Sequence, residues 1–452
     1  MRKSVLGQIS TWAVLPVLTA MPAAAQEQQT QDAQEAAPLI YSQSGGLMLL
    51  TLPDLPSGVV DNGNPTAGTG NETIVGMMVG MDLGKKLGKF AGFDVIGNLS
   101  FFIGTGERNT TTTSVVSGSG TVQIASNTQS TAAITLATDP NATSASSQVT
   151  LSLPGGGVTQ TQAAKTIPGG GAQTAFAVAL TTDNTGAVFS GVSTDGTNSQ
   201  AFAFGGAADP SGLTIVGTGD LSGLRITQQS LRSVVYMGAD ASVGLSPPSM
   251  DSTSYTPYLS VGYRMLNQEI SSLTSFDLPA PSGTNGFPLL GLQRYEHLDT
   301  NYLGGGVGLS VSHTLDNNIT FTGSAEAGLR GFDAKYSGRD LALFPINNAG
   351  LELQRFDVGR ATAEEKGVAW YAKGEAGLNF PLAPNLLLGF TGTVEYLSKV
   401  PTLERSAPVV QVSESGGSFN ATYPSGAGQQ STSISFVDSW NFGLKATLSG
   451  AF

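Results

Sequence analysis

The last thirteen residues of the chain alternate strictly between two kinds of side chain. One set is apolar or small: Trp440, Phe442, Leu444, Ala446, Leu448, Gly450 and Phe452. The other set is polar or small: Asn441, Gly443, Lys445, Thr447, Ser449 and Ala451. Because side chains on a β-strand alternate between two faces, this segment predicts a strand with one apolar face and one polar face. Its length suits a tilted strand that crosses a bilayer, for which roughly 9–11 residues are needed.

Eight earlier segments show the same alternation: 73–83, 93–103, 235–245, 259–265, 303–312, 319–330, 368–380 and 386–396. Short and long connections follow each other between these segments. The long ones are 105–231, 267–301, 336–366 and 398–431. Short turns on one side of a sheet and long loops on the other are the layout of transmembrane β-barrels, in which the short side is periplasmic.

The direction of the strands predicts one more crossing. If the last strand runs inward, the strand at Thr73 also runs inward, so an outward strand must precede it. Leu39–Leu52 is the apolar candidate, although its alternation is interrupted at Leu47–Leu50. Either this segment completes a ring of ten strands, which we expect, or it threads the lumen as a plug.

The N-terminus predicts export from the cytoplasm. Arg2 and Lys3 precede an apolar stretch, Trp12–Leu18, and residues 23–25 form an Ala-x-Ala cleavage site. We therefore assign residues 1–25 to a signal peptide and residues 26–38 to a periplasmic linker. The chain contains no cysteine, which excludes disulfides and thiol chemistry. After the signal peptide, no apolar run is long enough for a transmembrane helix, so a membrane protein of this sequence has to be a closed barrel.

The C-terminal strand resembles the closing strand of Gram-negative outer-membrane β-barrels, whose chains typically end in phenylalanine. Phe452 matches this signature, whereas Gly450 departs from the aromatic that many members carry two residues earlier. The resemblance implies that the barrel-assembly machinery recognises Phe452, so that its removal blocks assembly. It also implies a cell outer membrane location and contact with outer-membrane lipid.

The predicted fold is therefore all-β, a transmembrane up-and-down antiparallel β-barrel with a β-rich extracellular insertion. Residues 39–105 and 231–452 form the barrel, and residues 106–230 form the insertion. Between residues 109 and 230 only seven residues are charged, and Ser, Thr, Gly and Ala dominate. Short alternating runs such as Phe176–Leu180, separated by turn residues, favour a folded β-rich domain over disorder.

Ten charged residues fall on the polar faces of the predicted strands. They are Asp82, Asp94, Asp240, Arg264, Glu326, Arg330, Lys373, Glu375, Glu395 and Lys445. Charges at membrane depth have to be paired or hydrated, so we expect a structural ion-pair network in a narrow lumen. The alternative is a selectivity ring in an open pore, but water-filled channels generally need about 16–18 strands.

A histidine-based active site is a weaker hypothesis. His297 lies two residues before Asp299, on the same side of an extended chain, and a histidine oriented by a carboxylate can activate a nucleophile or water. The pair is similar to the Asp/His pair of outer-membrane aspartyl-type proteases, but the paired-Asp motif of that family, Asp-x-Asp, does not occur here. We therefore expect a simple ion pair with Arg294 at the rim, and no enzyme activity.

The sequence predicts neither cofactors nor metal ligands, and a net charge of −12 argues against nucleic acid as a partner. The favoured function is display of a surface domain, for adhesion, for anchoring of an extracellular or surface-layer partner, or for envelope structure. A passive channel for small solutes is the alternative, and a rim hydrolase using His297 is third.

Overall fold

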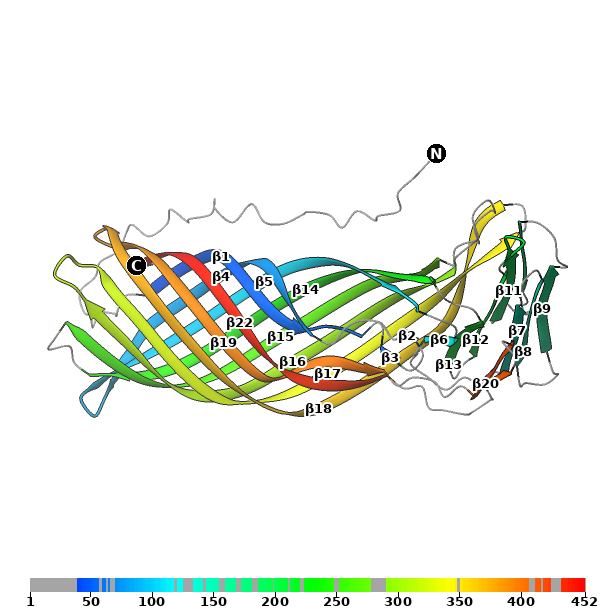
Figure 1. Ribbon diagram of the computed structural model, residues 1–452. Helices are drawn as coiled ribbons and strands as arrows, with labels where there is room; N and C mark the ends of the chain where they lie inside the picture. The colour runs from blue at the N-terminus through cyan, green and yellow to red at the C-terminus, as the bar shows by residue number, and fades with distance from the viewer. Residues whose placement is uncertain are drawn as a thin grey trace. The chain divides into compact units, whose positions relative to one another are not determined.

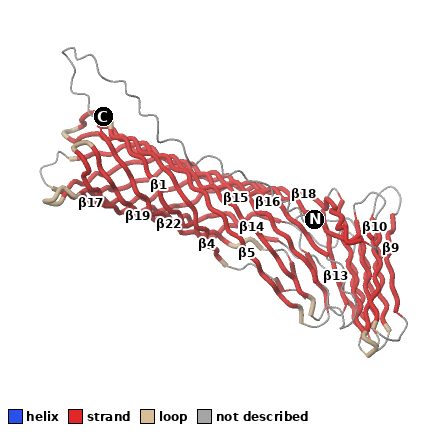
Figure 2. Tube along the Cα trace, turned by 90° about the horizontal axis from the view of Figure 1, so that it is seen from above, coloured by secondary structure: helices blue, strands red, loops and turns tan. Residues whose placement is uncertain are grey.

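The computed structural model describes residues 39–451, with gaps at 57–58, 62–63, 66–69, 118–119, 125–132, 141–143, 154–158, 168–171, 181–185, 198, 210–211, 220–222, 248–251, 278–289, 348–349, 406–410, 416–417 and 424–431. The predicted signal peptide, the periplasmic linker and Phe452 lie outside the described residues. Strands make up nearly all of the described chain (Figure 2). Within this part, no helix is long and apolar enough to cross a membrane.

Ten antiparallel strands form a ring, as the sequence predicts (Figure 1). In ring order they are β1 (Ile40–Pro53), β22 (Thr432–Ala451), β19 (Leu386–Arg405), β18 (Gly350–Ala383), β17 (Thr320–Asn347), β16 (Leu290–Thr314), β15 (Thr253–Asp277), β14 (Arg225–Ser246), β5 (Phe93–Val115) and β4 (Asn71–Phe90). β1 pairs with both β22 and β4. Leu39–Leu52 is thus a ring strand and not a plug, because the interrupted alternation at Leu47–Leu50 still sends Met48 and Leu50 inward and Leu47 and Leu49 outward.

Each ring strand presents large apolar side chains to the outside of the ring. Leu329 is 60% exposed, Leu444 60% and Trp370 52%, far more than a soluble surface usually tolerates in one continuous band. Further members of this band are Leu47, Val79, Phe101, Val261, Val307 and Phe390. The hydrocarbon core of a bilayer solvates such an apolar band. A closed ring also leaves no strand edge unpaired in the hydrocarbon. The barrel is therefore transmembrane.

The two ends of the ring differ. At one end, here called the turn end, short turns join β4 to β5, β14 to β15, β16 to β17 and β18 to β19. At the loop end the strands continue well past the apolar band. Segments 267–301 and 336–366, which the sequence suggests are loops, are mostly strand, since β15 runs to Asp277 and β17 pairs with β18 up to Asn347. The outer face of these strands is polar at the loop end. The strands therefore lack the alternation of apolar and polar residues by which lipid-facing strands are predicted.

A β-sandwich lies in the loop-end connections. One sheet has the order β10 (Gln173–Leu180), β11 (Gly186–Thr194), β12 (Ser199–Asp209), β13 (Gly212–Gly219), β6 (Gly120–Ile124), β2 (Val59–Asp61) and β3 (Asn64–Pro65). The other has the order β20 (Gln411–Ser415), β21 (Ser418–Tyr423), β7 (Ala133–Pro140), β8 (Ala145–Leu153) and β9 (Thr159–Ile167). The sheets approach closely because small side chains lie between them. The Ser190 hydroxyl, for example, donates to the Ser147 carbonyl at 2.7 Å.

The sandwich is built from more than the predicted insertion. β5 runs to Val115 and β14 begins at Arg225, so both strands extend past the expected boundaries at 106 and 230. Val116 and Leu224 continue this ladder through a backbone hydrogen bond of 2.9 Å. β2–β3 come from the connection between β1 and β4, and β20–β21 come from the connection between β19 and β22. Three separate loop-end connections therefore contribute strands to one folded unit.

Candidate functional site in the barrel lumen

The strand alternation directs charged side chains into the lumen, and glycines make room for them. Arg264 on β15 lies opposite Gly238 on β14. A Cβ at Gly238 would lie 2.7 Å from Nη1 of Arg264 and 2.5 Å from the ring of Phe102. The absence of a side chain at this position is what allows the guanidinium to lie flat across the lumen.

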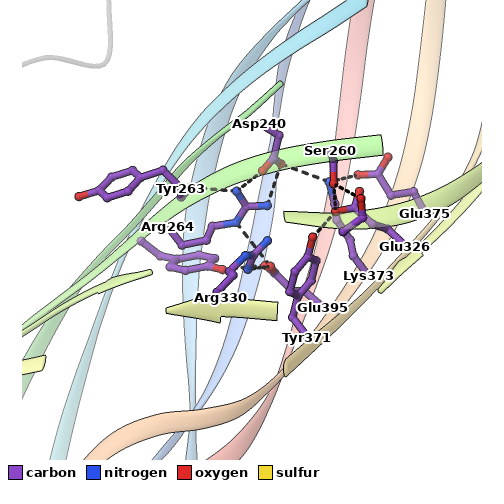
Figure 3. A network of polar contacts seen from close by, with 12 residues as sticks. Asp240, Ser260, Tyr263, Arg264, Glu326, Arg330, Tyr371, Lys373, Glu375 and Glu395 are labelled. Atoms are coloured by element: carbon purple, nitrogen blue, oxygen red, sulfur yellow. Dashed lines mark hydrogen bonds and ion pairs between the residues drawn. The ribbon is translucent and has the colours of Figure 1, made fainter. Parts of the chain in front are cut away.

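A central ion-pair network spans the lumen around Glu395 (Figure 3). The Glu395 carboxylate lies 2.7 Å from Nη1 of Arg330 and 3.4 Å from Nε of Arg264. Arg264 also donates two hydrogen bonds to Asp240, at 2.6 and 2.8 Å. The Tyr236 hydroxyl donates to Glu395 at 2.6 Å. These contacts join β14, β15, β17 and β19, strands that are not all neighbours in the ring, so the network links separate parts of the wall across the lumen.

A second branch of the network faces the turn end. Lys373 lies 3.2 Å from Glu375 and 3.7 Å from Asp240. Glu326 accepts hydrogen bonds from Ser260 at 2.7 Å and from the Tyr371 hydroxyl. The two branches meet at Asp240, so seven of the ten charged residues singled out in the sequence lie in or beside one network.

The other three lie nearer the turn end. Asp94 pairs with Lys86 at 2.7 Å, close to the turn between β4 and β5. Asp82 and Lys445 line a polar cavity of about 240 Å³, together with Glu375. The rest of its lining is small or neutral: Ser310, Thr322, Gly323, Ser324, Ala376, Gly377, Asn379, Thr391 and Thr447. This turn-end cavity has room for a small solute or for water.

The central part of the network, around Glu395, is closely packed. Arg264, Tyr302, Arg330 and Tyr371 are at most 1% exposed. The Arg330 guanidinium stacks 3.7 Å above the Tyr371 ring, and that of Arg264 lies 5.0 Å from the Phe102 ring. The sequence pattern did not single out Tyr302 and Tyr371 as residues of the lumen. Their inward positions on the alternating strands could have revealed them, but alternation does not distinguish an aromatic that packs from one that hydrogen-bonds.

An apolar layer lies on the loop-end side of the network. On β14, β15, β17 and β19, the next inward-facing side chain toward the loop end is apolar, as with Leu266 after Arg264 and Leu397 after Glu395. Other members of this layer are Leu50, Leu52, Ile74, Val234, Leu298, Phe332, Val400, Leu403 and Ile434, all 6% exposed or less. The lumen is therefore packed like a protein core here.

A further set of ion pairs, the outer layer, lies beyond the apolar layer. Arg232 lies 2.5 Å from Glu72, and its guanidinium also donates to Gln268. Arg294 pairs with Asp340 at 2.7 Å. Glu296 binds Arg405 and accepts a hydrogen bond of 2.7 Å from Tyr336. This layer was not predicted, because most of its residues lie in the segments taken for loops.

Asp54 lies in the connection after β1, next to the outer layer. Its backbone N–H donates to the Gly70 carbonyl at 2.8 Å. Burial, and secondly the negative charge of Glu72, raise the pKa of the Asp54 carboxyl above its usual value. This carboxyl therefore takes up a proton more readily than a free aspartate at the loop end.

His297 lies on the outer face of β16, away from the lumen. Its Nε2 is 2.7 Å from Asp299, and Nδ1 is 4.0 Å from Glu269. The expected pair of His297 with Arg294 is wrong, because Arg294 has the opposite strand parity, points inward and pairs with Asp340. Among the described residues, no group of three or more His, Cys, Asp or Glu side chains is arranged to hold a metal ion.

Comparison of the sequence with known protein families finds no match, and comparison with curated proteins finds none either. Among solved structures, the outer membrane protease OmpT from Escherichia coli is 10% identical, with a TM-score of 0.32 and coverage of 93% of this chain and 99% of that one. A FadL homologue from Pseudomonas aeruginosa is 9% identical, with a TM-score of 0.21 and coverage of 92% and 90%. The toluene transporter TodX from P. putida is 7% identical, with a TM-score of 0.21 and coverage of 93% and 91%. At these TM-scores, no activity can be transferred to this chain.

Proposed function

We propose that this protein is an outer-membrane barrel of a Gram-negative bacterium that anchors the β-sandwich at the cell surface and displays it to a binding partner. Display fits adhesion, the anchoring of a surface-layer or other extracellular partner, or a structural role in the envelope. The observation that carries the proposal is the sandwich itself, which takes strands from three connections at one end of the ring. In the predicted orientation that end faces outward.

The packing of the lumen supports a role as an anchor. A passive channel needs a continuous water path, whereas here an ion-pair network, an apolar layer and an outer layer fill successive sections. The fully buried Arg264 and Arg330 are fixed by carboxylates and aromatic rings. Ten strands give a lumen only slightly wider than the eight-stranded barrels that side chains alone can fill. The channel stays the second candidate, and the turn-end cavity is the observation that favours it.

A rim hydrolase has less support. His297 and Asp299 are paired with each other on the outer wall. A hydrolytic site also needs a nucleophile or water and donors for the developing charge, held together in a site that excludes bulk solvent. We therefore propose that the protein is not an enzyme.

Removal of the sandwich strands that lie in the connection between β5 and β14 tests the proposal. A short Gly-Ser turn can replace residues 118–221, because Val116 and Gly223 already approach within a backbone hydrogen bond of 2.9 Å. Loop length has only a small effect on stability, so we expect the shortened barrel to assemble, to stay non-conducting in a planar bilayer, and to lose binding of cells to host or surface-layer material. A matched control replaces residues 278–289, in the connection between β15 and β16, by the same turn.

Three results would decide against display. Unchanged surface binding after the deletion would separate the sandwich from the function. New ion conductance would mean that the sandwich covers a pore, in favour of the channel. Failure to assemble, with normal assembly of the control, would make the sandwich part of the barrel fold.

A further inference from the structure

At the loop end, two strands of the ring leave their neighbours. The ladder between β18 and β19 ends at Tyr371 and Leu397, and the ladder between β22 and β1 ends at Asn441 and Leu50. Beyond these points, in the described part of the chain, β19 and β22 pair only with each other, from Val400 opposite Val437 to Arg405 opposite Thr432. We call this two-stranded ribbon, residues 398–405 and 432–440, the flap.

The ladders end where the bilayer ends. Trp370, Tyr396 and Trp440 cluster on the outer wall at this level, with ring centroids 4.5 and 4.9 Å apart. Aromatic side chains of barrels concentrate at the membrane–water interface. Unpaired strand edges are not tolerated in hydrocarbon but can be hydrated above it. The flap is therefore the first part of these two strands that can leave the ring without exposing backbone groups to lipid.

A bulge at the base of the flap provides a hinge. The register between β19 and β22 shifts between Leu397 and Val400, so Ser398 and Lys399 lie outside the ladder. Bulges bend a strand and redirect the residues beyond them. A free two-stranded ribbon is only marginally stable alone, so the position of the flap depends on its side-chain contacts with the rest of the barrel.

Those contacts seat the flap over the apolar layer. Phe436 packs on Phe332 with the ring centroids 4.6 Å apart. Leu403 and Ile434, paired with each other on the same face of the flap as Phe436, face inward and are 6% exposed or less. Arg405 at the tip binds Glu296 on β16, and the Tyr302 hydroxyl donates to the Lys399 carbonyl at 2.9 Å.

We propose that the flap is a lid over the loop end of the lumen, hinged at Ser398–Lys399 and held shut by the Glu296–Arg405 pair and the apolar contacts beneath it. When it swings outward, the apolar layer becomes accessible from the cell exterior while the ring within the bilayer stays paired. The flap leads directly into the sandwich, since β20 begins at Gln411, shortly after Arg405.

The absence of cysteine allows a direct test. Leu403→Cys places a single thiol under the flap, at a position 3% exposed, and its reaction with a membrane-impermeant maleimide is followed on intact cells. Glu296→Gln removes the ion pair that crosses from β16 to the flap. We expect it to speed labelling of the thiol at least tenfold. Asp340→Asn is the matched control, because Arg294 and Asp340 lie in the same outer layer but on neighbouring strands of the wall, and should leave the rate unchanged.

A second reporter distinguishes a moving lid from loss of structure. Val192→Cys lies in the sandwich, where Val192 is fully buried, and its labelling should not change with Glu296→Gln. Equal acceleration by Glu296→Gln and Asp340→Asn, or acceleration at both reporters, would show general loosening and overturn the lid. No acceleration by Glu296→Gln would show that the flap is fixed. If Glu296→Gln fails to assemble, Arg405→Gln breaks the same pair from the flap side, and the same outcomes decide.

Discussion

Replacing Glu395 by glutamine perturbs the central network at a carboxylate that has three polar partners. Glu395 receives Arg330 at 2.7 Å, Arg264 at 3.4 Å and the Tyr236 hydroxyl at 2.6 Å. Glutamine keeps the size and one acceptor oxygen but removes the charge. Arg264 retains Asp240, whereas Arg330 retains mainly its stacking on Tyr371. The substitution therefore leaves a guanidinium that is 1% exposed without a counter-charge.

The expected cost depends on burial. Removing one partner of a buried ion pair typically destabilises by roughly 3–5 kcal/mol, and we expect Glu395→Gln to fall in this range. Glu375→Gln is the control, because Glu375 lines the turn-end cavity and the side chains of Glu375 and Lys373 are 27% and 24% exposed. Partial hydration and screening weaken such a pair, so we expect Glu375→Gln to cost clearly less than Glu395→Gln.

Reversible unfolding in lipid or detergent, followed by tryptophan fluorescence, measures both values. Trp370 and Trp440 lie on the outer wall at the membrane interface, and Trp12 belongs to the predicted signal peptide. The two tryptophans therefore report loss of the lipid-embedded ring. Equal destabilisation by the two substitutions, or a loss below 1 kcal/mol for Glu395→Gln, would refute the argument that Glu395 joins the buried charges across the lumen.

Three other predictions concern the ring. Ala446 lies on the lipid face and Thr447 lines the turn-end cavity. Ala446→Arg should therefore destabilise the barrel by roughly 2–4 kcal/mol, and Thr447→Arg by less, in the same unfolding assay. Similar losses would contradict the assignment of the two faces. Gly238→Val should cost roughly 1–3 kcal/mol, because any Cβ there would lie 2.7 Å from Arg264, whereas Ala239→Val, on the outer face, should be near neutral. Folded and boiled samples should migrate differently on a gel, because a hydrogen-bonded ring resists detergent. Identical migration of a verified folded sample and its boiled counterpart would count against a closed barrel.

The ring was predictable because the two faces of each strand lie in different environments, and the sequence of each strand follows from this difference. Lipid outside and polar side chains inside impose an alternation with period two, which Trp440–Ala451 displays without interruption. The tenth strand, β1 (Ile40–Pro53), was predicted despite its weak alternation, because neighbouring strands must run in opposite directions across the membrane. Where the outside of the wall is water, as in 267–277 and 336–347, both faces carry polar residues and the sequence no longer distinguishes strand from loop.

The lumen charges were likewise predictable as a set, but their partners were not. The sequence determined that Glu395, Arg264 and Arg330 point inward, because parity along a strand is local. Only the closed ring decided that three residues from β19, β15 and β17 meet at one point. Strand order, register and shear together determine which residues of different strands lie at the same level along the barrel axis. The flap depends on the same tertiary information, because it begins where the ladders between β18 and β19 and between β22 and β1 end. Where the pairing of two strands ends cannot be read from the sequence of either strand alone.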